Sequence, residues 1–281
     1  MKSIRIKAPA KINIGLFVTR KRIDGFHDIE TVFYPLNLHD ELIINKSDSF
    51  SFTCSNNLIA DDNNNLVIKS VKLLEKYSGR KLPVEIHLEK NIPIGAGMGG
   101  GSSDAAAVLL SLNEMFKLNF TIDMLRQFGL ELGSDVPFFI KPVPSFASSR
   151  GENLFPLTFK ISKPILIINP NIHISTRWAY ENITPQKAIT DLKLLDNFCS
   201  SDFTSFRETV FNLFEEAVFK IYPEIKSIKD FCYSSGAEFS LMTGSGSTVF
   251  AIFSSLEDAE KTGFYFQQKK YFTYLNYEDE N

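Results

Sequence analysis

The first part of the chain alternates apolar and polar residues with a period of two, the pattern typical of β-strands. The alternation predicts a strand over residues 3–7, ended by Pro9, and a second strand over residues 11–18. The second strand carries Lys11 and Asn13 on one polar face, opposite an apolar face. Further strands are predicted over residues 31–34, 40–44 and 50–54.

The pattern then changes to helical spacing. A helix is predicted from residue 65 to Gly79, because apolar residues recur three and four positions apart, namely Leu66, Val67, Val71, Leu74 and Tyr77. A strand over residues 84–88 follows, then a helix from about residue 103 to 116. Thr121 is a typical N-cap, which predicts a further helix that ends at Gly133.

The last part of the chain mixes both patterns. A short buried strand is predicted over residues 164–168, and we place a domain boundary shortly before it, giving domains of residues 1–158 and 159–281. Helices and antiparallel strands alternate without strict βαβ order, which favours an α+β fold. The helices are predicted over residues 175–181, 206–219, 224–233 and 256–267, and the strands over residues 238–242, 249–253 and 271–275.

Composition narrows the class of protein. The 281 residues are 44% apolar and include 26 phenylalanines, enough for a sizeable core. The net charge of -3 gives no basic balance, so neither a nucleic acid nor a membrane surface is expected as a partner. Neither a signal peptide nor an apolar run of membrane-spanning length is visible. The three cysteines, Cys54, Cys199 and Cys232, are far apart in the sequence and form no CxxC motif. They predict neither a disulfide framework nor a zinc site, so a cytoplasmic location is expected.

The segment from residue 93 to 107 is the main candidate for chemistry. It has five glycines within seven positions, then two serines and an apolar, alanine-rich run that predicts a helix. Glycines let backbone N–H groups approach a ligand closely, and a helix N-terminus adds unpaired N–H groups and a positive dipole end. The segment therefore predicts a phosphate-binding loop.

The spacing excludes two familiar phosphate loops. Gly95, Gly97 and Gly100 match the dinucleotide fingerprint, but a new helix cap at Thr121 stands where a Rossmann unit needs its second strand. A Walker A loop needs lysine where this chain has Gly101. A flexible linker is the remaining alternative, yet linkers are not followed by a serine-started helix.

Several motifs together resemble the GHMP kinases, which are ATP-dependent kinases of small molecules. They are residues 7–13, the loop of residues 93–107 and residues 241–246. The turn Asp24-Gly25-Phe26-His27 and the motif of residues 133–138 resemble the branch of that family that acts on 4-diphosphocytidyl-2-C-methyl-D-erythritol. The resemblance runs nearly end to end.

The resemblance implies a fold and an activity. The fold is a two-domain GHMP kinase fold, with an N-terminal domain like ribosomal protein S5 domain 2 and a ferredoxin-like C-terminal domain. The activity is phosphorylation of the 2-hydroxyl of a cytidine-diphosphate-linked polyol in the non-mevalonate route to isoprenoid precursors. The expected co-substrate is ATP, used with Mg²⁺; the oligomeric state is not implied.

The resemblance also implies site residues. Asp135 matches the catalytic base and Lys11 the catalytic lysine. Ser103 or Asp104 are candidate contacts to Mg²⁺. The implied substrate-binding residues are Asn13, Phe26, His27, Thr176 and Tyr180. The implied ATP-binding residues are Pro93, Ile94, Gly95, Ala96, Gly97, Met98, Gly99, Gly100, Gly101, Ser102, Ser103, Lys90, Asn65 and Leu66.

Each of these residues has a plainer interpretation from local sequence alone. Asp135 could cap a helix or turn, Lys11 could be a solvated surface lysine, and Tyr180 could be a core aromatic residue. Residues 243–246 could form an ordinary hairpin turn. At the level of the whole protein, the alternatives are a related kinase of homoserine, mevalonate or a sugar, and a non-catalytic nucleotide-binding regulator.

Overall fold

The computed structural model describes residues 3–59, 64–188, 190–193 and 203–277. Contacts divide the chain into two compact units built from discontinuous segments. Unit 1 contains residues 1–10, 37–94 and 99–142, and unit 2 contains residues 11–36, 95–98 and 143–281. Strands β1 (Ser3–Lys21) and β2 (His27–Lys46) contribute residues to both units. The predicted boundary at residue 158 stays a prediction.

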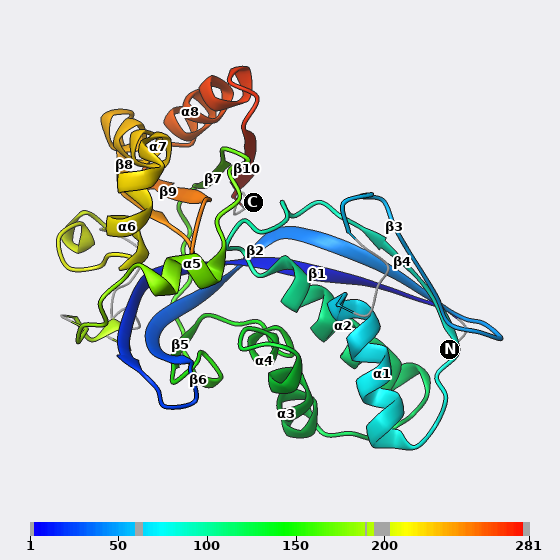
Figure 1. The fold of residues 1–281 in the computed structure, drawn as a ribbon. Helices are drawn as coiled ribbons and strands as arrows, with labels where there is room; N and C mark the ends of the chain where they lie inside the picture. Colours follow the sequence, from blue (N-terminus) through cyan, green and yellow to red (C-terminus); the bar gives the residue numbers. More distant parts are fainter. Residues whose placement is uncertain (1–2, 60–63, 189, 194–202, 278–281) are drawn as a thin grey trace. The chain divides into compact units, whose positions relative to one another are not determined.

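Unit 1 combines a small sheet with a group of helices. The C-terminal half of β2 pairs antiparallel with β4 (Val84–Glu89), and β3 (Ser51–Cys54) pairs parallel with β4. Helices α1 (Leu66–Ser78) and α2 (Gly100–Met115) pack together and lie on one side of these strands (Figure 1). Helices α3 (Ile122–Leu132) and α4 (Val136–Phe139) pack against each other and against α2.

Unit 2 contains two groups of strands. The N-terminal half of β2 pairs with β5 (Ser145–Ser148), which in turn pairs with β6 (Asn153–Pro156). A separate antiparallel sheet has the order β10-β7-β9-β8, from strands Phe272–Asn276, Ile165–Asn169, Val249–Phe253 and Ala237–Met242. This sheet and the helices on it are the part of the chain predicted to be ferredoxin-like.

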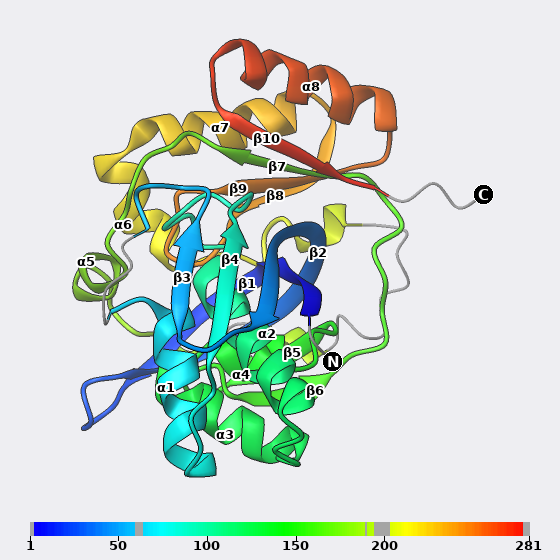
Figure 2. The same cartoon turned by 90° about the vertical axis from the view of Figure 1, so that its right-hand side faces the viewer.

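The helices of unit 2 bury their apolar faces on this sheet. Helices α7 (Pro223–Ser234) and α8 (Leu256–Gln268) contact its strands and lie on the same side of it in both views (Figures 1 and 2). Helices α5 (Thr176–Glu181) and α6 (Phe214–Ile221) contact each other, and a 3₁₀ turn spans Thr204–Phe206. Strand β9, an inner strand of this sheet, is buried at every position.

Local capping explains where several helices begin and end. Asn65 and Thr121 accept hydrogen bonds from Val67 N and Met124 N, which caps α1 and α3 as the sequence indicates. Gly79 ends α1 at φ +65°, a left-handed conformation in which glycine carries no Cβ penalty. The predicted mixture of helices and mainly antiparallel strands is confirmed.

Three predicted boundaries are wrong. Strand β1 continues through Pro9, because β1 pairs only with β2 among the described strands and a proline on its open side breaks no ladder. The strands predicted over residues 31–34 and 40–44 are one strand, β2. The helix predicted over residues 206–219 begins only at Phe214, because the backbone of Leu16 donates to Phe211 O and accepts from Leu213 N in the segment before it.

Two further elements were not predicted. The return after residue 144 forms the β5–β6 hairpin, and α4 follows Asp135. The phosphate-loop helix α2 begins at Gly100, before the serines that were expected to start it. Cys54 and Cys232 are unpaired thiols, and Cys199 lies outside the described residues.

Candidate active site

In unit 2, the predicted catalytic lysine lies in a buried hydrogen-bond chain. Lys11 is 3% exposed, so it is not a solvated surface lysine. Its ammonium donates to Asn13 Oδ1 at 2.6 Å and to the carbonyl of Gly97 at 3.0 Å. A buried charge is stable only when it is paired or hydrogen-bonded, and here oxygens of a side chain and of the glycine loop hold it.

Asn13 extends this series of hydrogen bonds into the protein interior. Its backbone N–H donates to Thr243 Oγ1 at 2.9 Å, and its carboxamide donates to Thr31 Oγ1 at 2.9 Å. Thr31 in turn donates to the carbonyl of Gly15 at 2.6 Å. Asn13 is 2% exposed, so the structure places it under the site, where it holds Lys11. A direct contact between Asn13 and a substrate stays a prediction.

The glycine loop and the turn of residues 243–246 are interlocked backbone to backbone. The loop glycines Gly95, Gly97 and Gly99 all have φ between +64° and +77°, a region that L residues rarely adopt. A Cβ on Gly97 would lie 2.3 Å from the carbonyl oxygen of Thr243. The turn is therefore part of the same site as the loop, and the ordinary-hairpin interpretation is insufficient.

In unit 1, the N-terminus of α2 continues this loop. Gly99 caps α2 in a left-handed conformation and supplies no side-chain hydrogen bond to the first turn. The first N–H groups of a helix have no intrahelical partner, so they can bind an anion. The hydroxyl of Ser103 is buried and finds no hydrogen-bond partner among the described residues. Both features suit an oxygen-rich, negatively charged ligand.

Lys90, a predicted ATP contact, is buried in an ionic cluster below α2. Its ammonium contacts Asp40 Oδ2 and lies 3.1 Å from Asp104 Oδ2. Asp40 Oδ1 accepts hydrogen bonds from the backbone of Asn91 and Ile92, which lead into the glycine loop. The ammonium is therefore shared between the two carboxyl groups. A contact between Lys90 and adenine stays a prediction.

Burial changes the protonation of this cluster. It raises the pKa of Asp104 to about 7, against the opposing attraction of Lys90. The nearby charge of Asp40 adds to this rise. The Lys90 ammonium stays protonated, because the two carboxylates raise its pKa above the ordinary value despite burial.

The other two residues of the predicted ATP pocket lie at the start of α1. Asn65 caps that helix through its side chain, as described above. Leu66 Cδ1 lies 3.7 Å from the position that a Cβ on Gly101 would take, so α1 starts beside the start of α2. The position of an adenine ring here stays a prediction.

The predicted cytidine-binding residues meet in unit 2. His27 and Tyr180 stack with ring centroids 4.7 Å apart, and Tyr180 also packs edge-on against Phe214. Burial and the charge of Lys21 lower the pKa of His27, which favours the neutral imidazole. Thr176, at the start of the same helix as Tyr180, bonds Ser245 Oγ at 3.1 Å. The structure thus brings the turn of residues 24–27, α5 and the turn of residues 243–246 together.

Phe26 stands at the tip of this group. Its side chain is 47% exposed, and the guanidinium carbon of Arg150 lies 3.7 Å from the centroid of its ring. Such a cation–π contact holds the ring while leaving part of its surface open to a planar ligand. Arg150 was not predicted, because nothing in its local sequence indicates a partner 124 positions earlier in the chain.

Asp135, the predicted base, belongs to unit 1. It stands directly before α4 with φ −83° and ψ −17°, and its side chain makes no capping hydrogen bond to that helix. Asp135 therefore occupies the N-cap position of α4 without capping it through its side chain, and its role as the base stays a prediction. Lys11 belongs to unit 2, so the meeting of Lys11 with Asp135 stays a prediction.

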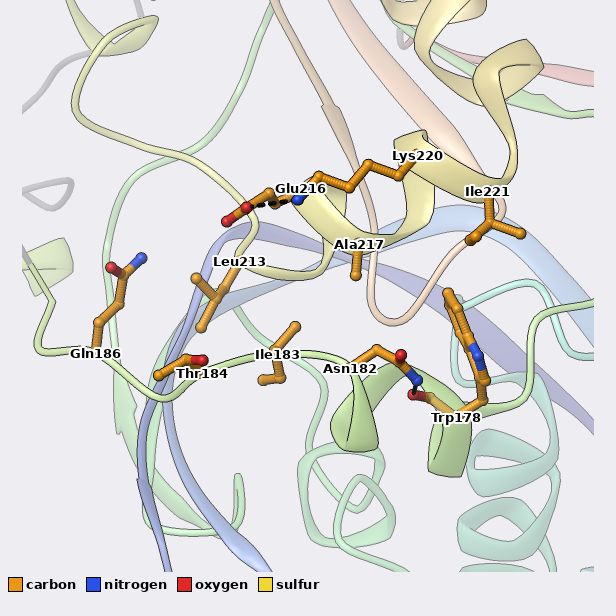
Figure 3. Close-up of a pocket in the computed structure, with 10 residues that line it drawn as sticks. All are labelled: Trp178, Asn182, Ile183, Thr184, Gln186, Leu213, Glu216, Ala217, Lys220 and Ile221. Carbon is orange, nitrogen blue, oxygen red and sulfur yellow. Dashed lines mark hydrogen bonds and ion pairs between the residues drawn. The ribbon is translucent and has the colours of Figure 1, made fainter.

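A pocket of about 400 Å³ lies elsewhere in unit 2, between α5 and α6 (Figure 3). Trp178 and Ile221 line one end and Gln186 the other, with the Glu216–Lys220 ion pair along α6. The pocket contains none of the predicted site residues. The pocket and the predicted substrate site share helix α5, which carries Trp178 of the pocket and the predicted site residues Thr176 and Tyr180.

Comparison with known proteins decides the family. Residues 65–141 match the GHMP kinases N terminal domain, and residues 194–271 match the GHMP kinases C terminal domain. A 4-diphosphocytidyl-2-C-methyl-D-erythritol kinase of Prosthecochloris aestuarii is 43% identical over 265 residues, which is 93% of each chain. The enzyme of the same name from Thermodesulfovibrio yellowstonii is 39% identical, again over 93% of each chain.

The chain belongs to the 4-diphosphocytidyl-2-C-methyl-D-erythritol kinase family of GHMP kinases. A crystal structure of a 4-(cytidine 5'-diphospho)-2C-methyl-D-erythritol kinase matches with a TM-score of 0.79 at 30% identity, covering 97% of this chain and 98% of that one. Homoserine kinase from Cytophaga hutchinsonii matches with a TM-score of 0.73 at 19% identity, covering 98% and 95%, and supports the shared fold alone. The expected two-domain GHMP kinase fold is confirmed.

Two absences concern only the described part of this family member. No helix there is long and apolar enough to cross a membrane. Within the same residues, no three side chains from histidine, cysteine, aspartate and glutamate gather as metal ligands would.

The ionic cluster under α2 generates a prediction on stability. The pKa of Asp104 is raised in the folded state, so the folded chain binds more protons than the unfolded chain between about pH 4 and pH 7. The free energy of unfolding should therefore fall as the pH rises through this window. Urea unfolding at pH 5 and pH 8 should show a smaller decrease for Asp104→Asn than for the wild type. Equal pH dependence of the two proteins would contradict a buried, partly protonated Asp104.

Proposed function

We propose that this protein transfers the γ-phosphoryl group of ATP to the 2-hydroxyl of 4-diphosphocytidyl-2-C-methyl-D-erythritol, giving the 2-phosphate and ADP. The observation that carries the proposal is the buried Lys11 ammonium bonded to the carbonyl of the phosphate-loop residue Gly97. The identity of 37–43% to kinases named for this substrate supports the choice of alcohol. A non-catalytic regulator would have no need to bury and orient this lysine.

Each part of the chain contributes to phosphoryl transfer by position and charge. The backbone N–H groups of the glycine loop and of the first turn of α2 bind the triphosphate and stabilise the charge that develops on it. The Lys11 ammonium adds a positive charge next to that loop. Asp135 accepts the proton of the 2-hydroxyl as the new P–O bond forms.

The cytidine end of the substrate is held in unit 2. Phe26 offers an open ring face for the cytosine base, and Tyr180 offers a second aromatic ring stacked on His27. Stacking needs only a ring face, so phenylalanine serves as well as tyrosine at position 26. Thr176, next to the turn of residues 243–246, is placed for the polyol end.

Magnesium fits this site as part of the nucleotide. The buried Ser103 hydroxyl, with no partner among the described residues, is a suitable oxygen for the ion. Asp104 fits less well, because Lys90 contacts one of its carboxylate oxygens and burial raises the pKa of Asp104 to about 7. When bound, Mg²⁺ neutralises phosphate charge, and phosphates and water supply most of its ligands.

The direct test is ADP release from MgATP with different alcohols. We expect turnover with 4-diphosphocytidyl-2-C-methyl-D-erythritol and little with homoserine or mevalonate, the substrates in the names of structurally similar GHMP kinases. Homoserine and mevalonate carry no cytosine base, so the proposed cytidine-binding residues could not bind them. A clear preference for homoserine or mevalonate would contradict the proposed substrate and leave the fold unaffected.

Asp135→Asn should reduce kcat by about two orders of magnitude or more, because the amide cannot accept the hydroxyl proton. ATP binding should be retained, since the phosphate loop is intact. Asp123→Asn is a matched control, because Asp123 is an exposed residue of the first turn of α3. Steady-state kinetics with nucleotide-binding titrations separates the two effects, and near-normal turnover of Asp135→Asn would exclude Asp135 as the base.

Phe26→Ala should raise the KM for the cytidine substrate by roughly tenfold, with kcat little changed. Loss of a base–aromatic stack accounts for about 1–3 kcal/mol in single-stranded nucleic-acid complexes, a comparable contact. Phe155→Ala is the control, because Phe155 is another exposed phenylalanine of unit 2 outside the proposed site. An unchanged KM for Phe26→Ala would exclude the cytidine clamp.

A further inference from the structure

Asn212 lies in the irregular segment directly before α6. The backbone on both sides of it is fixed to β1, because Leu16 N donates to the carbonyl of Phe211 and Leu213 N donates to the carbonyl of Leu16, each at 2.9 Å. Asn212 is 2% exposed, and its Oδ1 accepts the N–H of Phe214 at 3.0 Å. The side chain therefore has a defined position on a rigid segment of unit 2.

The amide end of Asn212 reaches the second glycine turn. Its Nδ2 donates to the carbonyl of Met242 at 2.7 Å and to the carbonyl of Gly244 at 2.8 Å. These two carbonyls flank Thr243. One NH₂ group with two hydrogens holds both, which a carboxylate could not do because it has no donor.

Thr243 passes this restraint to the predicted catalytic lysine. Its hydroxyl accepts from Asn13 N at 2.9 Å and donates to Asn13 Oδ1 at 3.3 Å. The same Oδ1 accepts from the Lys11 ammonium at 2.6 Å. Each link is buried, so the interactions act at low dielectric and water does not compete for them.

We propose that Asn212 is a positioning residue for phosphoryl transfer: its carboxamide fixes the turn around Thr243 and thereby sets the position of Lys11 through Asn13. The role assigned to Lys11 rests on the proposed function. Asn212 itself touches neither substrate in this arrangement. Displacements of about 1 Å in reacting groups reduce rates by about two orders of magnitude. A residue that fixes Lys11 only through Thr243 and Asn13 can therefore still affect kcat.

The test compares Asn212→Ala and Asn212→Asp with Asn113→Ala. Asn113 is a matched control, because its carboxamide also closes a loop, donating to the carbonyl of Phe120 and accepting from Phe120 N, both at 3.0 Å, but in unit 1. All variants should lose stability, since each removes hydrogen bonds that are buried at Asn212 and part-buried at Asn113. Kinetics are therefore measured at a temperature where circular dichroism shows every variant folded.

For both Asn212 variants we expect kcat to fall roughly tenfold or more, with the KM for the cytidine substrate within about threefold of wild type. The hydrogen bonds of Asn212 reach none of Phe26, His27 and Tyr180 directly, which is why this KM should change little. Asn113→Ala should keep the wild-type kcat. If the Asn212 variants also keep it, the positioning role is wrong.

A double-mutant cycle with Thr243→Val tests the route. Valine keeps the shape of threonine but removes the hydroxyl that bonds Asn13. If Asn212 acts through Thr243, the double variant should be about as slow as the slower single variant, because residues in one network are not additive. Multiplied effects would show that Asn212 acts by another route and would overturn the proposal. Thr243→Ser, which keeps the hydroxyl, should recover most of the kcat lost in Thr243→Val.

Amide hydrogen exchange at Asn13 gives a readout without turnover. Its N–H donates to Thr243 Oγ1, so exchange should be faster in Asn212→Ala than in Asn113→Ala. Equal exchange in the two variants would overturn the proposal. If the wild type released no ADP with the cytidine substrate, the proposed function would fail, and this exchange comparison would still decide the role of Asn212.

Discussion

The fold of unit 2 depends on how one buried positive charge is accommodated. The Lys11 ammonium is almost fully enclosed, and burial of an unpaired ammonium is too unfavourable for a marginally stable chain. Asn13 Oδ1 and the carbonyl of Gly97 hold it, and Thr243 and Thr31 hold Asn13. A charge held in this way is preorganised for the phosphoryl transfer proposed above.

The same requirement explains the glycines. Gly97 must bring its carbonyl to Lys11 while its α-carbon lies against the carbonyl of Thr243, where no Cβ fits. The loop is therefore rich in glycine both for the ligand and for the contact beneath it. Unit 1 also contains a buried ammonium, that of Lys90, which lies between Asp40 and Asp104 under the start of α2.

The sequence predicted what local patterns determine. Asn65, Thr121 and Gly79 mark helix ends through contacts within a few residues, and those ends are found in the structure. Pro9 does not end the strand as predicted, because whether a proline interrupts a strand depends on which neighbours the strand has. The segment before α6 was wrongly predicted as helix because its conformation also depends on a distant neighbour. Its backbone bonds Leu16, about 195 positions earlier in the chain.

The candidate site shows the same difference between residues in local motifs and residues whose partners are distant in the sequence. The motifs indicated Lys11, Asp135, the loop of residues 93–107 and the turn of residues 243–246 as candidates, because each motif is a local run. They could not indicate Asp40, Arg150 or Asn212, since these side chains act on partners far away in the sequence. Nor could they indicate that Asn13 is enclosed, because burial is a property of the folded chain.

The measurement that tests the account most directly is a crystal structure of the protein with a non-hydrolysable MgATP analogue and 4-diphosphocytidyl-2-C-methyl-D-erythritol. The account predicts that the triphosphate lies against the N–H groups of residues 95–103, with the 2-hydroxyl between the γ-phosphate and Asp135 and with Lys11 in contact with the transferred group. A triphosphate bound elsewhere, or Lys11 and Asp135 on opposite sides of the acceptor, would contradict it.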